Sequence, residues 1–222
     1  MLRIGAPLSA LFVASLLCTA AAADPIGPSG CTNGTCQGVI YTLEYDPTPV
    51  ATTATTETFR ITYSIDTTGP LDAALATAVG IDTTAVKVAG SIVGGSLFSA
   101  PAPATWAGHA DQVLNANGCN ANGGGGWFCA DITSGAAPAL GGLLQWIFDI
   151  EVNTGTLKTG AGEASVKARY IDSSGDKIGA LVSEPITLQE GFPPVPEPGS
   201  ALLLGSGLLG LAFAGSRRRV RS

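Results

Sequence analysis

The chain has 222 residues, a formal net charge of −6 and only 13% charged residues. Its single histidine excludes a metal site built from several histidines. Its acidic balance argues against nucleic acid as a partner, because an acidic surface repels phosphate backbones.

The N-terminus has the three parts of a secretory signal peptide. Arg3 supplies the positive start, residues 4–17 form an apolar stretch, and Ala21 and Ala23 are the small residues of a cleavage site. We therefore expect residues 1–23 to form a signal helix that is removed on export.

Residues 24–188 are expected to form one exported domain, followed by a linker over residues 189–195 that contains one glycine and two prolines. Between residues 24 and 195 there are six basic and 16 acidic residues, which gives a net charge of −10. This charge favours solubility and leaves cation binding open.

Strand patterns dominate this domain. Six segments are rich in β-branched and aromatic residues: 39–45, 58–65, 85–93, 144–152, 164–171 and 178–188. In the second segment Phe59, Ile61 and Tyr63 alternate with polar residues, as in a strand with one buried face.

The intervening residues predict turns and very little helix. Residues 172–176, Asp-Ser-Ser-Gly-Asp, predict a tight turn that joins the last two strands into a hairpin. Residues 69–80 predict at most a short helical turn. About seven to nine strands in total predict an all-β fold, an antiparallel β-sandwich of the jelly-roll or immunoglobulin-like type.

Four cysteines remain after the signal peptide, and an even number in an exported chain indicates disulfides. Three connectivities are possible, of which we favour the local pairs Cys31–Cys36 and Cys119–Cys129. A zinc site is the alternative, but four and nine intervening residues do not fit the common zinc-binding spacing.

Few side chains suggest catalysis. Asp149 and Glu151 lie two residues apart on one predicted strand, and paired carboxylates are the catalytic groups of glycoside hydrolases. Their alternation with Trp146 and Phe148 places them on the solvated face, where acidic residues are common. The sequence has no Gly-x-Ser-x-Gly motif whose serine could form a catalytic triad with His109, so this histidine is expected in a loop. We therefore expect no enzyme activity, no cofactor and no metal.

The three tryptophans are the candidates for stacking on sugars, although core packing is the better expectation for each. Trp146 belongs to an apolar strand face, and Trp127 is expected to pack on the disulfide loop. Trp106, in a proline-rich region, is the one plausible exposed platform. The acidic turns at residues 66–69 and 172–176 are explained by side-chain to backbone hydrogen bonds and do not match a calcium loop.

The C-terminal end combines three features in order. First comes an extended proline-rich motif made of Val195, Pro196, Glu197 and Pro198. Residues 199–216 then carry no charge and, at about 1.5 Å per residue, span about 27 Å as a helix, enough to cross a hydrocarbon core. Four arginines that favour the cytoplasmic face follow: Arg217, Arg218, Arg219 and Arg221.

This tail resembles the PEP-CTERM sorting signal of exported bacterial proteins, over residues 196–222, with a transmembrane helix at about 199–216 and a basic tail at 217–222. The resemblance implies processing near the motif by an exosortase-type membrane protease, followed by delivery to the cell surface or extracellular matrix. A plain membrane anchor is the alternative, but it would not need Pro-Glu-Pro.

Together these features predict a non-catalytic surface or biofilm-matrix protein of a Gram-negative-type bacterium. It would cross the inner membrane, stay anchored with its C-terminus in the cytoplasm, and end at the cell surface. One alternative is a carbohydrate-binding or adhesive module of the extracellular polysaccharide. A weaker alternative is a surface glycoside hydrolase that uses Asp149 and Glu151.

Overall fold

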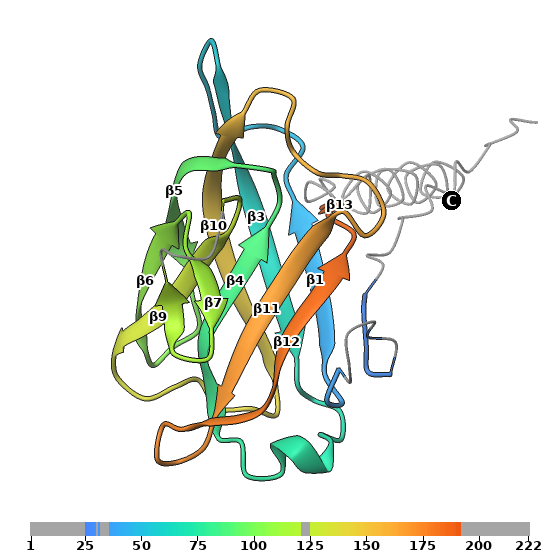
Figure 1. Ribbon diagram of the computed structural model, residues 1–222, viewed down its shortest axis with the longest axis vertical. Coiled ribbons are helices and arrows are strands. Elements are labelled where there is room, and N and C mark those ends of the chain that lie inside the picture. Colours follow the sequence, from blue (N-terminus) through green and yellow to red (C-terminus); the bar gives the residue numbers. More distant parts are fainter. Residues whose placement is uncertain (1–24, 30, 32–35, 121–124, 192–222) are drawn as a thin grey trace, which may run out of the picture.

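The computed structural model describes residues 25–29, 31, 36–120 and 125–191 (Figure 1). The predicted signal peptide, with Ala21 and Ala23, and the predicted sorting signal both lie outside the described residues. Among the residues described, no helix is long and apolar enough to cross a membrane.

The larger sheet has six strands in the order β13-β1-β3-β10-β5, with β2 paired to β3 beside this path. Its pairs are antiparallel, except for the parallel pair of β1 and β13. The strands are β1 (Ile40–Tyr45), β2 (Ala51–Thr52), β3 (Thr56–Asp66), β5 (Ile92–Ser99), β10 (Leu143–Asn153) and β13 (Gln189–Glu190).

The second sheet is antiparallel and has five strands in the order β12-β11-β4-β9-β6. These are β4 (Gly80–Lys87), β6 (Thr105–Ala110), β9 (Phe128–Ser134), β11 (Ala164–Ile171) and β12 (Lys177–Ile186). A separate hairpin joins β7 (Val113–Asn115) to β8 (Gly118–Asn120), and a single turn of 3₁₀ helix spans Ala73–Leu75.

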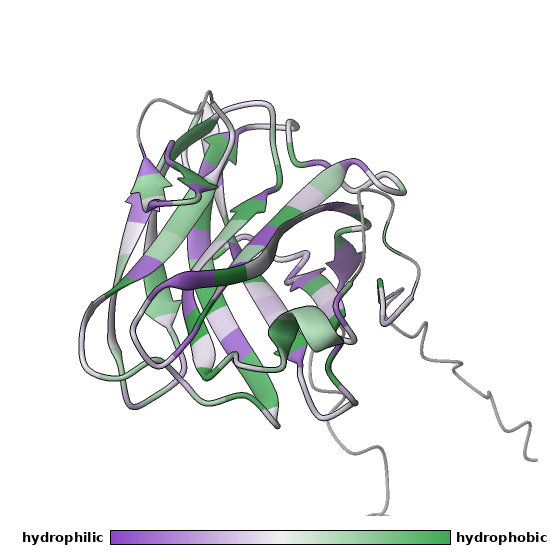
Figure 2. Cartoon of the chain, turned by 60° about the horizontal axis from the view of Figure 1, so that its bottom comes forward, coloured by the Kyte–Doolittle hydropathy of each residue, from purple (hydrophilic) through white to green (hydrophobic). Residues whose placement is uncertain are grey.

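The two sheets pack face to face around one core, so the predicted all-β sandwich is confirmed. Side chains of both sheets meet there. The hydroxyl groups of Tyr41 on β1 and Tyr170 on β11 form a hydrogen bond, with 2.7 Å between their oxygen atoms. Burial alternates along the strands, which Figure 2 shows as alternating hydrophilic and hydrophobic bands. This period of two drives the layering, because each strand buries one face.

Several predicted strands agree closely with the structure. Residues 58–65 lie within β3, residues 144–152 lie within β10, and the segment 164–171 coincides with β11. The predicted hairpin is also present, since β11 pairs with β12 and Asp172 accepts a backbone hydrogen bond from Gly175 in the turn. The weak helical signal at residues 69–80 corresponds to the 3₁₀ turn alone.

The prediction of one strand over residues 85–93 is wrong. These residues contain the end of β4, a connection through Gly90, and the start of β5. The first part of β4 was missed because its polar residues Thr83 and Thr84 are buried, whereas the alternation rule assigns such residues to the solvated face.

A small second cluster of buried side chains lies outside the main core. Ala85 and Cys129 alternate along their strands with Val86 and Ala130, which belong to the main core, so they occupy the outer face of the five-stranded sheet. The β7–β8 hairpin covers this face, with Leu114 in the cluster.

The structure contains both local disulfides, Cys31–Cys36 and Cys119–Cys129. The second links β8 to β9 and therefore holds the β7–β8 hairpin against the sheet that it covers.

The sandwich extends slightly beyond the boundary expected from the sequence. Gln189 and Glu190, assigned to the linker, form β13 and pair with β1. The amide of Gly191 then donates to the carbonyl of Tyr45 at 2.7 Å. The domain therefore continues past residue 188 because its last residues complete the edge of the larger sheet.

Candidate functional site

The outer face of the six-stranded sheet carries an ion pair between paired strands. Arg60 of β3 lies directly opposite Asp149 of β10. The Arg60 Nε and Nη2 atoms donate to the two carboxylate oxygens of Asp149 at 2.9 and 3.0 Å. This hydrogen bonding raises the pKa of Arg60, so the guanidinium stays charged.

Phe98 of β5 extends the same surface. The Arg60 guanidinium carbon lies 3.8 Å from the centroid of the Phe98 ring, a cation–π contact. The ring is nevertheless 57% exposed, and large apolar side chains with this exposure are uncommon in the described part of the chain. Phe98 therefore offers an aromatic surface that a neighbouring cation holds in place.

A shallow, open hollow of about 220 Å³ lies beside Phe98. It is lined by residues of β5, β6 and the segment between them: Leu97, Phe98, Ser99, Ala100, Ala104 and Trp106. The exposed lining is mainly polar and includes atoms of two aromatic residues, a combination that suits sugar hydroxyls and ring C–H groups better than a purely apolar ligand.

Trp106 does not form an exposed platform. It lies in β6, its indole Nε1–H donates to the carbonyl of Pro101 at 3.1 Å, and its ring meets Trp146 edge to face at 5.4 Å between centroids. Trp106 therefore packs against the core and presents only part of its surface to the hollow. The expectation of core packing holds for Trp146, which is fully buried, and Trp127 packs beside Cys129.

The two candidate catalytic carboxylates lie on the outer face, as the alternation predicts. Both contact neighbouring strand residues: Asp149 binds Arg60, and the Oε1 atom of Glu151 accepts a hydrogen bond from the Thr56 hydroxyl at 2.6 Å. These contacts join β3 to β10 and explain both carboxylates as cross-strand structural groups.

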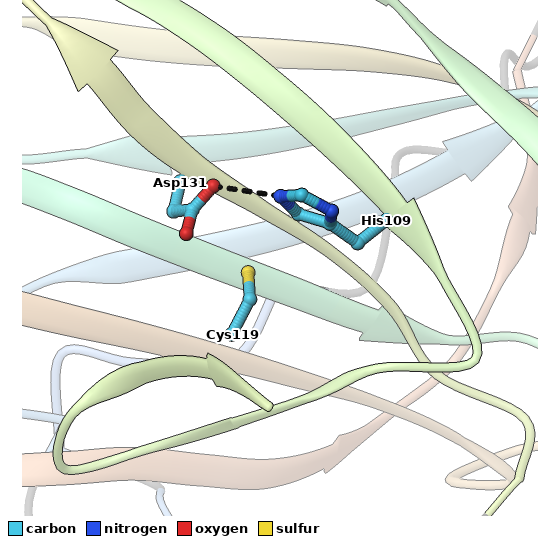
Figure 3. A group of neighbouring side chains, drawn as sticks. All are labelled: His109, Cys119 and Asp131. Atoms are coloured by element: carbon cyan, nitrogen blue, oxygen red, sulfur yellow. Dashed lines mark hydrogen bonds and ion pairs between the residues drawn. The ribbon is translucent and has the colours of Figure 1, made fainter. Parts of the chain in front are cut away.

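His109 lies in β6, so its expected place in a loop is wrong. Its Nε2 atom is 2.9 Å from Oδ1 of Asp131 on β9, and Cys119 of β8 points toward the pair (Figure 3). Possible ligand atoms of the three residues lie within 4.8 Å of one another. However, the Cys119 sulfur is bonded to Cys129, so it is no thiolate, and two ligands are fewer than zinc sites use.

The acidic turns have the chemistry expected of them. Oδ1 of Asp66 accepts hydrogen bonds from the Thr68 hydroxyl at 2.7 Å and its amide at 2.9 Å, which lower the pKa of Asp66. Oδ1 of Asp172 accepts from the amides of Ser174 and Asp176. Local turn geometry therefore accounts for these carboxylates.

The sequence could point to some of these side chains but not to their grouping. The alternation placed Arg60 and Asp149 each on the solvated side of its own strand. Their pairing depends on the register of two strands that are 89 residues apart at this point. Phe98 was not identified from the sequence as a surface residue, because it lies in a strand that contains glycine and serine and has no strict alternation of apolar and polar residues.

The sorting residues lie outside the described part of the chain, namely Val195, Pro196, Glu197, Pro198, Arg217, Arg218, Arg219 and Arg221. Residues 194–219 match the PEP-CTERM protein-sorting motif. The chain therefore carries this sorting motif at its C-terminal end, behind a β-rich domain, and the expected resemblance is confirmed.

The other comparisons add little about the domain. No curated protein matches the chain significantly. A crystal structure of an uncharacterized protein from Nocardia farcinica, described as revealing an immunoglobulin-like fold, matches with a TM-score of 0.35 and 13% sequence identity. The match covers 68% of this chain and 91% of that one.

Proposed function

We propose that the protein is a non-catalytic component of the cell surface or extracellular matrix, processed near residues 195–198 by an exosortase-type membrane protease. The observation that carries the proposal is the sorting motif at residues 194–219 behind a β-sandwich. The domain contains two disulfides, Cys31–Cys36 and Cys119–Cys129. They fit an exported protein, since disulfides persist outside the cytoplasm.

A structural role for the domain has its own support. The carboxylates of Asp149 and Glu151, the best candidates for hydrolysis, serve contacts between β3 and β10. A general acid needs access to its substrate, whereas both carboxylate oxygens of Asp149 accept hydrogen bonds from Arg60 on the same face. The arrangement therefore favours a rigid surface module.

The sorting proposal is tested with two variants. One removes the carboxylate that the protease would recognise, and the other removes the arginines that would hold the tail at its depth in the membrane. We expect Glu197→Ala to leave the protein exported but unprocessed in the inner membrane, because the motif carboxylate is no longer presented to the protease. Removing Arg217–Arg221 should give an unprocessed, unanchored form. Each arginine opposes passage by about 2.5–3.5 kcal/mol at the bilayer centre. The measurement is cell fractionation with immunoblotting, in hosts with and without the exosortase.

The matched control is Glu163→Ala, which removes an exposed carboxylate outside the motif and should leave processing unchanged. Equal release of mature protein by the wild type and all variants, with or without the protease, would show that the tail is an ordinary anchor. Mass spectrometry of the released protein would locate the processed bond.

The hollow beside Phe98 supports a second candidate function, that of a carbohydrate-binding module. Its two aromatic rings and polar lining are features of sugar-binding surfaces. We expect Phe98→Ala to weaken binding to purified matrix polysaccharide in affinity electrophoresis. Val93→Ala is the control, because Val93 is 52% exposed on the same strand but does not line the hollow. Equal retardation of both variants and the wild type would exclude this surface.

A further inference from the structure

Basic residues gather on the outer face of the five-stranded sheet. Lys87 of β4 and Lys167 of β11 both alternate with fully buried residues that point into the core. The strand register pairs Lys87 with Ser165 and Lys167 with Ala85, so the two lysines are diagonal neighbours on adjacent strands. Side chains in this relation are close enough to contact one ligand.

Both ammonium groups lie over the ring of Trp127. The Nζ atom of Lys167 is 4.7 Å from the centroid of the Trp127 ring, and that of Lys87 is 6.0 Å away. The indole is 9% exposed and packs with Cys129 in the outer cluster. Because the disulfide fixes the hairpin over this cluster, the indole and the two cations form a preorganised surface.

The two lysines differ from the neighbouring arginine in their partners. Arg169, also on this face, is bound by the carboxylate of Asp82 and donates to the carbonyl of Ala116 at 2.8 Å. Within the described residues, neither Lys87 nor Lys167 has a carboxylate oxygen within 4.0 Å. Lys167 donates to the Leu114 carbonyl at 3.4 Å.

Two neighbouring cations without an anion between them are electrostatically unfavourable. Partial burial, and then the charge of Lys87, lower the pKa of Lys167. An anionic group placed between the two ammonium ions would compensate both, because each ammonium can donate a charge-assisted hydrogen bond. The arrangement is conspicuous in a domain that carries a net charge of −10.

We propose that Lys87, Lys167 and Trp127 form a binding site for the acidic group, carboxylate or sulfate, of an anionic polysaccharide. The two ammonium groups bind the acid, and the small exposed part of Trp127, which is 9% exposed, contacts the C–H groups of the sugar ring. A polysaccharide suits the site better than a nucleic acid. The strongly acidic domain repels a dense phosphate backbone, whereas acid groups spaced along a sugar chain reach one short-range basic site.

The site is distinct from the hollow beside Phe98, which is lined by residues of β5, β6 and the segment between them. A negative binding result at one of these sites would therefore not contradict the proposal for the other. The proposal is also independent of how the tail is processed.

The test uses the exported protein recovered from its host and three probes: polygalacturonate, dextran sulfate and neutral dextran. We expect binding of one or both acidic polymers and none of dextran. Lys87→Gln and Lys167→Gln should each weaken binding about tenfold or more, the usual effect of losing a hydrogen bond to a charged group. Quenching of tryptophan fluorescence on binding should disappear in Trp127→Phe.

Two matched variants complete the experiment. Lys177→Gln makes the same charge change at the start of β12 and should leave affinity unchanged. Lys167→Arg keeps the charge and should retain most of the binding. The two acidic probes distinguish carboxylate from sulfate as the bound group. Absence of binding to both polymers, equal weakening by Lys177→Gln, or equally lysine-dependent binding of single-stranded RNA would overturn the proposal.

Discussion

Arg60 and Asp149 face each other across β3 and β10 and form a two-point ion pair, with both nitrogen–oxygen distances at or below 3.0 Å. The same guanidinium covers the ring of Phe98 on β5. One arginine therefore connects three neighbouring strands, β3, β10 and β5, on the outer face of the larger sheet.

A double-mutant cycle should measure this connection. We expect Arg60→Ala and Asp149→Ala to be coupled by about 0.5–1 kcal/mol, because the pair is well aligned but partly exposed. Urea unfolding of both single variants and the double variant gives the value, and high salt should reduce it. Additive losses would mean that the pair contributes nothing beyond its separate side chains.

The second disulfide should stabilise the domain measurably. Replacing Cys119 and Cys129 together by serine should cost about 2–3 kcal/mol, the value for a loop of this size, because the unfolded chain gains freedom. Hydrogen exchange should accelerate most in the β7–β8 hairpin. Non-reducing peptide mapping of the wild type is the accompanying control, and a Cys31–Cys119 peptide would contradict the pairing on which the prediction rests.

Gly108 should tolerate no side chain. A Cβ atom added there would lie 2.9 Å from the Phe128 ring and 2.9 Å from the Leu97 Cβ atom, so Gly108→Ala is expected to cost about 1–3 kcal/mol through overpacking. Gly142→Ala is the control, since nothing lies within 4 Å of its added Cβ. Thermal unfolding of both variants checks the prediction, which fails if their midpoints fall equally.

Alkaline pH should destabilise the fold through its buried tyrosines. Burial raises the pKa of Tyr41, Tyr63 and Tyr170 well above the ordinary value of about 10. The folded state therefore keeps these protons when the unfolded chain loses them. Stability should be fully present below about pH 10 and fall above it, by about 1.4 kcal/mol per pH unit for each tyrosine.

Denaturant unfolding between pH 9 and 11 provides the measurement for the tyrosines. Tyr170→Phe should make the decline shallower by the contribution of one ionising group, because the variant has one buried hydroxyl fewer. An unchanged slope in this variant would show that Tyr170 ionises equally in the folded and unfolded states.

The sequence predicted those strands whose apolar residues alternate without interruption, such as residues 58–65 and 164–171. It missed most of β5, where Gly94 and Gly95 replace side chains that would define a face. At Gly95 a Cβ atom would lie 2.6 Å from the Asp149 carbonyl oxygen, so close packing of neighbouring strands selects a residue that carries no pattern.

The candidate surfaces were less predictable than the strands, for a physical reason. Lys87 and Lys167 become neighbours only through the register of β4 and β11, and Arg60 meets Asp149 only through that of β3 and β10. Register between distant strands is set by the packing of the whole core, which local periodicity does not contain. The tail differs because its three features are consecutive in the sequence, so a linear motif suffices to identify it.

The placement of β13 determines how the domain would bear mechanical load. Tension applied to the chain beyond Gly191 first reaches β13, whose two residues pair with β1 along the margin of the larger sheet. It then reaches β12, the outermost strand of the other sheet, which among the described strands pairs with β11 alone. Both strands can peel away without being drawn from between two neighbours. A protein tethered by this end would therefore yield at its margin while the central strands of both sheets stayed assembled.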